Sequence, residues 1–190
     1  MIVVLNGAPR SGKSSIAAAM QESIDGLWLN VGVDVARQMT PPRAQPGIGL
    51  RPGSDDHPAA EHVPLLYAAL WETVAAHERL GLNVVTDVGL YDPALAADAA
   101  RRLAGLHVLF VGVECPDEVV LERRQAAPGA YSPALEWTQR WREAVHPGWA
   151  YDLTVDTSRS SPEECAAAIQ ARLDDGLPFE AFGRLATFRA

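Results

Sequence analysis

The sequence has 190 residues, of which 48% are hydrophobic and 21% are charged, the balance of a single globular domain large enough to bury a core. Its net charge of −8 argues against a basic face, so nucleic acid is not an expected partner, although a local basic pocket for phosphate remains compatible with this charge. No apolar run approaches the roughly eighteen residues that a membrane span needs, and no signal peptide is recognisable. We therefore expect a cytoplasmic protein without a membrane partner.

Apolar runs alternate with helix-like stretches along the chain. Strands are predicted at 1–6, 27–33, 83–87, 106–113 and 153–156. Helices are predicted at 13–24, 59–80, 93–103, 116–125, 132–145 and 161–173. Residues 40–58 are rich in proline and glycine and predict a long irregular loop. This alternation predicts an α/β fold with a five-stranded parallel sheet, in which ligands bind at the carboxyl ends of the strands.

The turn between the first strand and the first helix carries a phosphate-binding motif. It matches G-x-x-x-x-G-K-[ST], and it has the strand before it and the helix after it that the motif requires. Backbone N–H groups of such a phosphate-binding loop (P-loop) converge on phosphate oxygens, and the helix N-terminus adds positive potential. Lys13, the only lysine of the chain, is expected to reach the β- and γ-phosphates, and Ser14 to supply a hydroxyl to Mg²⁺. The motif consists of Gly7, Ala8, Pro9, Arg10, Ser11, Gly12, Lys13 and Ser14.

The remaining sequence favours a small kinase over other P-loop proteins. Common GTPases read guanine with Asn-Lys-x-Asp, which this chain does not contain because its only lysine already lies in the P-loop. Motor ATPases and transporter subunits are usually longer. A kinase needs a group that takes the proton of the acceptor hydroxyl, an acidic residue near Mg²⁺, and arginines over the transferring phosphoryl group.

Two aspartates are candidates for the first two tasks. Asp34 is predicted at the end of the second strand, where its carboxylate would act as the base, although an aspartate there can instead cap a short helix. Asp87 ends the third strand and fits a carboxylate that holds Mg²⁺, with a turn-forming aspartate as the equal alternative. Asp92 is better explained as a helix cap.

Four arginines are candidates for the clamp on the γ-phosphate. Arg123 and Arg124 lie in the helix that follows the fourth strand, and Arg140 and Arg142 lie on a later tryptophan-rich helix. Guanidinium groups bind phosphate oxygens in a fork geometry, but each of these arginines can equally be a solvated helix charge. Which of the four contacts the phosphate is left open at this point.

Several segments together resemble the chloramphenicol phosphotransferase family of P-loop kinases, from residue 2 to about residue 173. Gly32-Val33-Asp34, and the run from Val145-His146 to Val155-Asp156-Thr157, are more particular to that family than the P-loop is. The other matching pieces are Leu5-Asn6-Gly7, Gly12-Lys13-Ser14, Trp28-Leu29, Val111-Gly112-Val113 with Cys115, Gly148 and Tyr151-Asp152.

The resemblance implies a phosphate-binding loop over residues 7–15, which includes Ser15, and a three-layer sandwich like that of nucleoside monophosphate kinases. It implies ATP with Mg²⁺ as the donor, Asp34 as the base that activates an alcohol, and Arg124 as the arginine at the start of the lid. Where the family's prototype has further basic residues in the lid, residues 126–131 read Ala-Ala-Pro-Gly-Ala-Tyr, so Arg140 or Arg142 can complete the clamp. Residues 1–175 would form the kinase domain. Residues 176–190 would be an aromatic tail that docks on this domain or on a second subunit of a homo-oligomer.

The function expected from these features is transfer of a phosphoryl group from ATP to a hydroxyl of a small molecule, with chloramphenicol-like antibiotics, and hence antibiotic resistance, as one acceptor class. A metabolic kinase for a nucleoside, nucleotide or sugar is the alternative with the same fold. A nucleotide-binding regulatory module without kinase activity is the alternative of another class.

Overall fold

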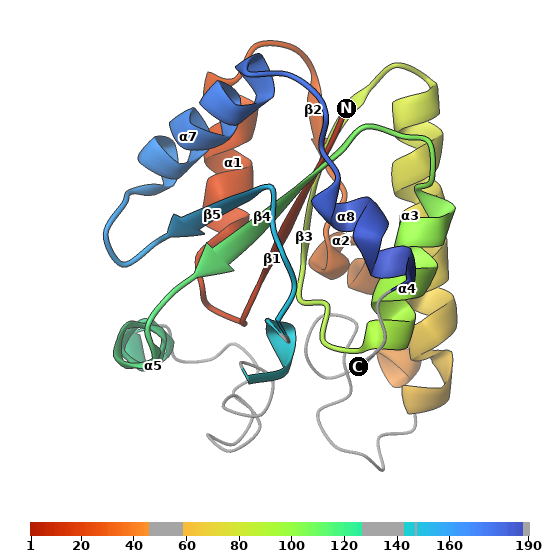
Figure 1. Ribbon diagram of the computed structural model, residues 1–190. Coiled ribbons are helices and arrows are strands. Elements are labelled where there is room, and N and C mark those ends of the chain that lie inside the picture. The colour runs from red at the N-terminus through yellow and green to blue at the C-terminus, as the bar shows by residue number, and fades with distance from the viewer. Residues whose placement is uncertain (46–58, 127–142, 147, 188–190) are drawn as a thin grey trace.

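A five-stranded parallel sheet in the order β2-β3-β1-β4-β5 forms the centre of the computed structural model, which describes residues 1–45, 59–126, 143–146 and 148–187 (Figure 1). The predicted α/β fold and parallel sheet are confirmed. The second strand is shorter than predicted, because the chain leaves the sheet after Asn30 and enters a helix at Val33. The strands are β1 (Ile2–Gly7), β2 (Trp28–Asn30), β3 (Asn83–Val88), β4 (Val108–Glu114) and β5 (Leu153–Asp156).

Helices cover both faces of the sheet, which gives the expected three layers (Figure 1). On one face, α1 (Lys13–Ser23) and α7 (Pro162–Asp174) pack against the sheet. On the other face lie α3 (Val63–Arg79), α4 (Pro93–Arg102) and α8 (Ala181–Arg184). Because both faces are covered, every residue of β1 is buried, as its continuous apolar pattern predicts.

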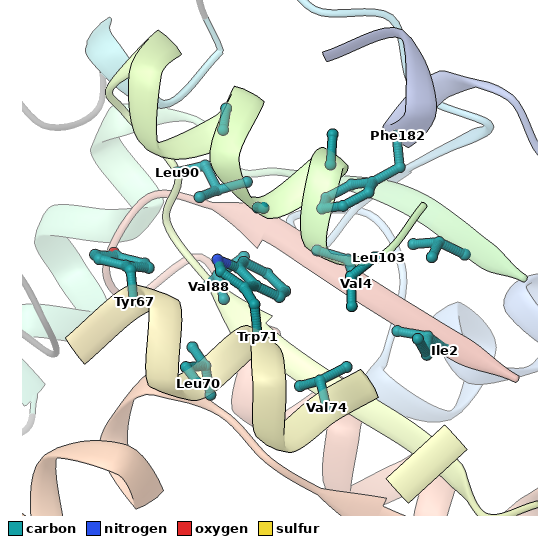
Figure 2. Packing of buried hydrophobic residues seen from close by; sticks show 14 of the residues in the cluster. Ile2, Val4, Tyr67, Leu70, Trp71, Val74, Val88, Leu90, Leu103 and Phe182 are labelled. Carbon is teal, nitrogen blue, oxygen red and sulfur yellow. The ribbon is translucent and has the colours of Figure 1, made fainter. Parts of the chain in front are cut away.

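The core on the α3 side includes the C-terminal segment of the chain. Phe182 of α8 is 2% exposed and packs against Trp71 of α3, with ring centroids 5.8 Å apart (Figure 2). Asp152 fixes this segment, since its two carboxylate oxygens accept from the backbone N–H groups of Phe110, Glu180 and Ala181. Of the two docking sites considered for the tail, the domain itself therefore holds residues 180–187.

The helix ends largely follow the local signals in the sequence. Asp92 caps α4 by accepting from the backbone N–H of Ala94 at 2.7 Å, and Ser161 with Glu164 forms the capping box of α7. The remaining elements are α2 (Val33–Gln38), α5 (Asp117–Ala126), η1 (Pro42–Ala44), η2 (Ala60–His62) and η3 (Leu185–Thr187). Most of the predicted helix 132–145 and of the predicted loop 40–58 lies outside the described residues. Within the described part, no helix is both long enough and apolar enough to cross a membrane.

Candidate active site

The P-loop leaves the sheet at the carboxyl end of β1, which is its central strand. Arg10 has φ 68° and Gly12 has φ 97°, so the loop needs two residues in the left-handed region before α1 begins at Lys13. The Lys13 side chain is buried, and its Nζ donates to the carbonyl oxygens of Gly7 at 2.9 Å and Ala8 at 2.7 Å. The ammonium group therefore lies over the loop, where the motif requires it.

Ser14, the last residue of the motif, meets the carboxylate at the end of β3. Its Oγ donates to Asp87 Oδ2 at 2.6 Å, and Asp87 is only 6% exposed. The other carboxylate oxygen lies against Gly32, where a Cβ would stand 1.7 Å from Asp87 Oδ1. The same position is 3.3 Å from Asn30 Oδ1, which is buried and has no hydrogen-bond partner among the described residues. Helix α1 and the strands β3 and β2 thus contribute to one oxygen-rich group, made by Ser14, Asp87 and Asn30.

Asp34 lies in the first turn of α2, and the prediction that it ends the second strand is wrong. The physical reason is that Val33 is buried as a helix residue, so the apolar run continues past the end of the strand. Asp34 does not cap the helix either, because Gly32 occupies the N-cap position. The Asp34 side chain is 62% exposed and forms a 3.7 Å ion pair with Arg37, a contact that is weak at such exposure.

Arg123 connects helix α5 to the P-loop through Thr157. Its guanidinium donates to Thr157 Oγ1 at 3.0 Å and to Thr157 O at 2.7 Å, and Thr157 Oγ1 donates to the carbonyl oxygen of Ser11 at 2.7 Å. Arg123 is thereby held against the loop after β5. Arg124 follows it in the last turn of α5. The other two candidates, Arg140 and Arg142, lie outside the described residues.

A buried polar network adjoins the P-loop on the opposite side of the sheet from α1. Asn6, just ahead of Gly7, donates from Nδ2 to Val145 O at 2.9 Å and to the Tyr151 hydroxyl at 3.0 Å. The Tyr151 hydroxyl in turn lies 2.5 Å from Nδ1 of His146. Burial raises the pKa of Tyr151, and burial lowers the pKa of His146, with a further lowering from the Lys13 charge that Glu114 opposes.

Nucleotide and magnesium fit these residues by the chemistry of the donor set. The Ser11 hydroxyl is buried inside the loop without a hydrogen-bond partner in the described part of the chain, as expected of a donor that serves a ligand. The positive charge of the Lys13 ammonium, which lies over the loop, offsets part of the negative charge of a bound phosphate. The hydroxyl of Ser14 and the carboxylate of Asp87 are hard oxygen ligands of the kind that Mg²⁺ takes.

Sequence reasoning missed Gly32 and Thr157 as parts of this site. Both occur in segments that carry the family resemblance, which is the one signal that pointed toward them. Gly32 has no side chain and the Thr157 hydroxyl acts through hydrogen bonds, so the importance of both comes from contacts with distant residues.

A P-loop after β1, in a parallel sheet of order 2-3-1-4-5, defines a P-loop kinase. Two solved structures share this fold. An unliganded sugar kinase from Janibacter sp. HTCC2649 has a TM-score of 0.65 and 20% identity, with 98% of both chains covered. The Mycobacterium tuberculosis APS kinase CysC, in complex with AMPPNP and APS, has a TM-score of 0.67 and 20% identity, with 91% of this chain and 96% of that chain covered. A P-loop kinase of this fold thus binds an ATP analogue.

Residues 1–174 match the family described as Chloramphenicol phosphotransferase-like protein, and the chain belongs to this family. A relative from Mycobacterium tuberculosis strain CDC 1551 / Oshkosh, "Putative O-phosphotransferase MT2714", is 27% identical over 87% of this chain and 78% of its own length. The chain is accordingly a phosphotransferase of the kinase class.

Proposed function

We propose that this protein transfers the γ-phosphate of ATP, with Mg²⁺, to a hydroxyl of a small molecule, and that chloramphenicol-like alcohols are the first acceptor class to test. The observation that carries the proposal is the 2.6 Å hydrogen bond between Ser14 Oγ and Asp87 Oδ2. It joins the last residue of the P-loop motif to a carboxylate on the neighbouring strand, where oxygen ligands for Mg²⁺ are needed.

In this proposal each residue performs a task that its position supports. Ser14 and Asp87 would hold Mg²⁺, and residues 7–15 would bind the phosphates of ATP through backbone N–H groups. ATP with Mg²⁺ supplies the phosphoryl group and part of the charge compensation. The Lys13 ammonium opposes the negative charge that spreads over the phosphoryl oxygens, and Arg124 at the end of α5 adds a fork-shaped donor.

Asp34 is the proposed base. It lies two residues after Gly32, which contacts Asp87, so α2 begins beside the proposed magnesium ligands. Its exposed carboxylate forms a 3.7 Å ion pair with Arg37 and has lone pairs available to hydrogen-bond an acceptor hydroxyl and take its proton. In this proposal the acceptor binds at the carboxyl edge of the sheet, beside α2.

The test is incubation of the pure protein with ATP, Mg²⁺ and a panel of chloramphenicol-like alcohols, aminoglycosides, nucleosides and sugars. Mass spectrometry then shows which acceptor gains a phosphoryl group. We expect Asp34→Asn to abolish that product while ATP affinity stays within about twofold, because the change removes a proton acceptor and leaves the P-loop intact. Asp25→Asn is the matched control, since Asp25 is exposed just ahead of β2, at the amino end of that strand. Full turnover by Asp34→Asn would remove Asp34 from the role of base.

A further inference from the structure

The Asn6 side chain is oriented by main-chain groups whose hydrogen-bonding roles are fixed. Its Oδ1 accepts from the backbone N–H of Leu90 at 2.7 Å, and a backbone N–H can only donate. Its Nδ2 donates to the carbonyl oxygen of Val145, which can only accept. The Asn6 amide therefore cannot be turned around, and its second N–H is the one that faces the Tyr151 hydroxyl.

This orientation decides where the proton lies on His146. Among the described residues the Tyr151 hydroxyl contacts Asn6 Nδ2 and His146 Nδ1, and because Nδ2 can only donate, Nδ1 of His146 is the group placed to accept the Tyr151 proton. A neutral imidazole that accepts at Nδ1 carries its proton on Nε2. Burial and the Lys13 charge both lower the pKa of His146, against the opposing effect of Glu114, and a lowered pKa favours the neutral ring. The chain thus holds His146 as a neutral N–H donor.

Tyr151 is itself held rigidly. Its ring lies over Gly112 of β4, where a Cβ would stand 2.7 Å from Tyr151 Cδ2, and its centroid is 4.6 Å from that of Phe110. Through the Tyr151 hydroxyl, which Asn6 also contacts, these contacts hold the His146 ring in place.

The fixed imidazole is linked to the phosphate-binding residues. Asn6 directly precedes Gly7, and the Gly7 carbonyl oxygen accepts from Lys13 Nζ at 2.9 Å. His146 is therefore two hydrogen bonds away from the strand end that carries the P-loop. In Figure 1 the short cyan segment that holds residues 143–145 lies beyond the carboxyl ends of β1 and β4, on the same edge as the P-loop.

We propose that His146 is a phosphate-binding residue whose Nε2–H donates to an oxygen of the γ-phosphoryl group, and that Tyr151 and Asn6 are positioning residues that fix its tautomer. The inference rests on the proposed ATP-dependent function. A neutral donor is suited to this place, because it adds a hydrogen bond to the phosphoryl group without adding a second titratable cation beside Lys13.

The test compares Mg²⁺·AMPPNP with Mg²⁺·ADP, which differ by the γ-phosphoryl group, in ¹⁵N NMR spectra of the histidine rings. His146→Gln assigns the signal. We expect the free protein to show protonated Nε2 and unprotonated Nδ1, and AMPPNP but not ADP to shift the Nε2 signal. Tyr151→Phe keeps the ring over Gly112 but removes the hydroxyl, so both tautomers should become populated.

Binding measurements provide the second readout. His146→Ala should weaken AMPPNP about tenfold and leave ADP within about twofold, which is the effect of one hydrogen bond to a charged group. His146→Gln, which keeps an N–H at similar reach, should recover most of the loss. His107→Gln, at an exposed histidine just ahead of β4, should change neither nucleotide.

Equal responses to AMPPNP and ADP would overturn the inference. It would also be overturned if His146→Ala changed the affinity for the acceptor and left both nucleotide affinities unchanged. A single tautomer that survives in Tyr151→Phe would overturn the positioning role. If wild-type protein bound neither nucleotide, the proposed function itself would fail, and this outcome is distinct from one in which both nucleotides bind and His146 is silent.

Discussion

Replacing Gly32 with alanine tests whether this glycine exists to make room for Asp87. Gly32 has φ −89°, a value that any residue adopts, so an alanine there is not strained by its backbone. A Cβ would instead stand 1.7 Å from Asp87 Oδ1, about half of an ordinary contact distance, so the carboxylate has to turn away. When it turns, the 2.6 Å hydrogen bond from Ser14 is lost.

The expected cost follows from the contacts that are lost. A hydrogen bond to a charged group contributes about 1.5–3 kcal/mol, and this one is partly buried. Gly32 is also the N-cap of α2, where alanine is worse than glycine by roughly 0.5–1 kcal/mol. Gly32→Ala should therefore lower the free energy of unfolding by about 2–4 kcal/mol.

A double-mutant cycle separates the two contributions. The cost of Gly32→Ala is measured by urea denaturation in wild-type protein and in Asp87→Ala, which has no carboxylate to collide with. The difference between the two costs should be about 1.5–3 kcal/mol, and the N-cap contribution cancels. Gly183→Ala is the control, because a Cβ there meets no atom within 4 Å. An equal cost in both backgrounds would refute the argument.

Three further predictions follow from the described contacts. Thr157→Val removes the hydroxyl that joins Arg123 to the P-loop. It should lower the free energy of unfolding measured in urea by about 1–2 kcal/mol and weaken ADP binding measured by calorimetry. The control Thr154→Val, at an exposed position of β5, should do neither. Phe182→Ala should cost about 3–5 kcal/mol in thermal unfolding and leave ADP affinity within twofold, since this ring fills the core away from the P-loop. Because burial lowers the pKa of His146, its contribution to stability is complete above the ordinary histidine value of 6.5 and declines as the pH falls below it. His146→Gln should flatten that part of a stability-against-pH curve, and an unchanged slope would contradict the assignment.

Local signals in the sequence predicted most of the fold, and the main error arose where a local signal was ambiguous. Capping residues and the P-loop spacing act over a few residues, so they can be recognised without tertiary information. The end of β2 could not be found in this way. Val31 and Val33 are both buried, yet Val31 follows the strand and Val33 begins a helix, so the apolar pattern continues unchanged across the boundary.

The residues of the candidate site also fall into two groups, those that local sequence signals indicate and those that depend on distant contacts. Lys13 and Ser14 were predicted because the motif places them within one turn. Asn6 and Tyr151 are 145 residues apart in sequence, and nothing in either segment indicates that their side chains meet. Gly32 was overlooked as a site residue because it acts by having no side chain, which leaves room for the Asp87 carboxylate.

The early end of β2 also explains how the proposed magnesium ligand and the proposed base are kept in register. Val31 remains tied to β3, since its N–H donates to Val85 O at 3.0 Å and its carbonyl accepts from Thr86 Oγ1 at 2.7 Å. The next residue, Gly32, lies against the Asp87 carboxylate, and Asp34 emerges from the helix two residues later. Residues 31–34 thus run from the sheet, past the proposed magnesium ligand Asp87, to the proposed base. A change at Gly32 should therefore disturb proton transfer at Asp34 as well as Mg²⁺ affinity, whereas Asp34→Asn should affect proton transfer alone.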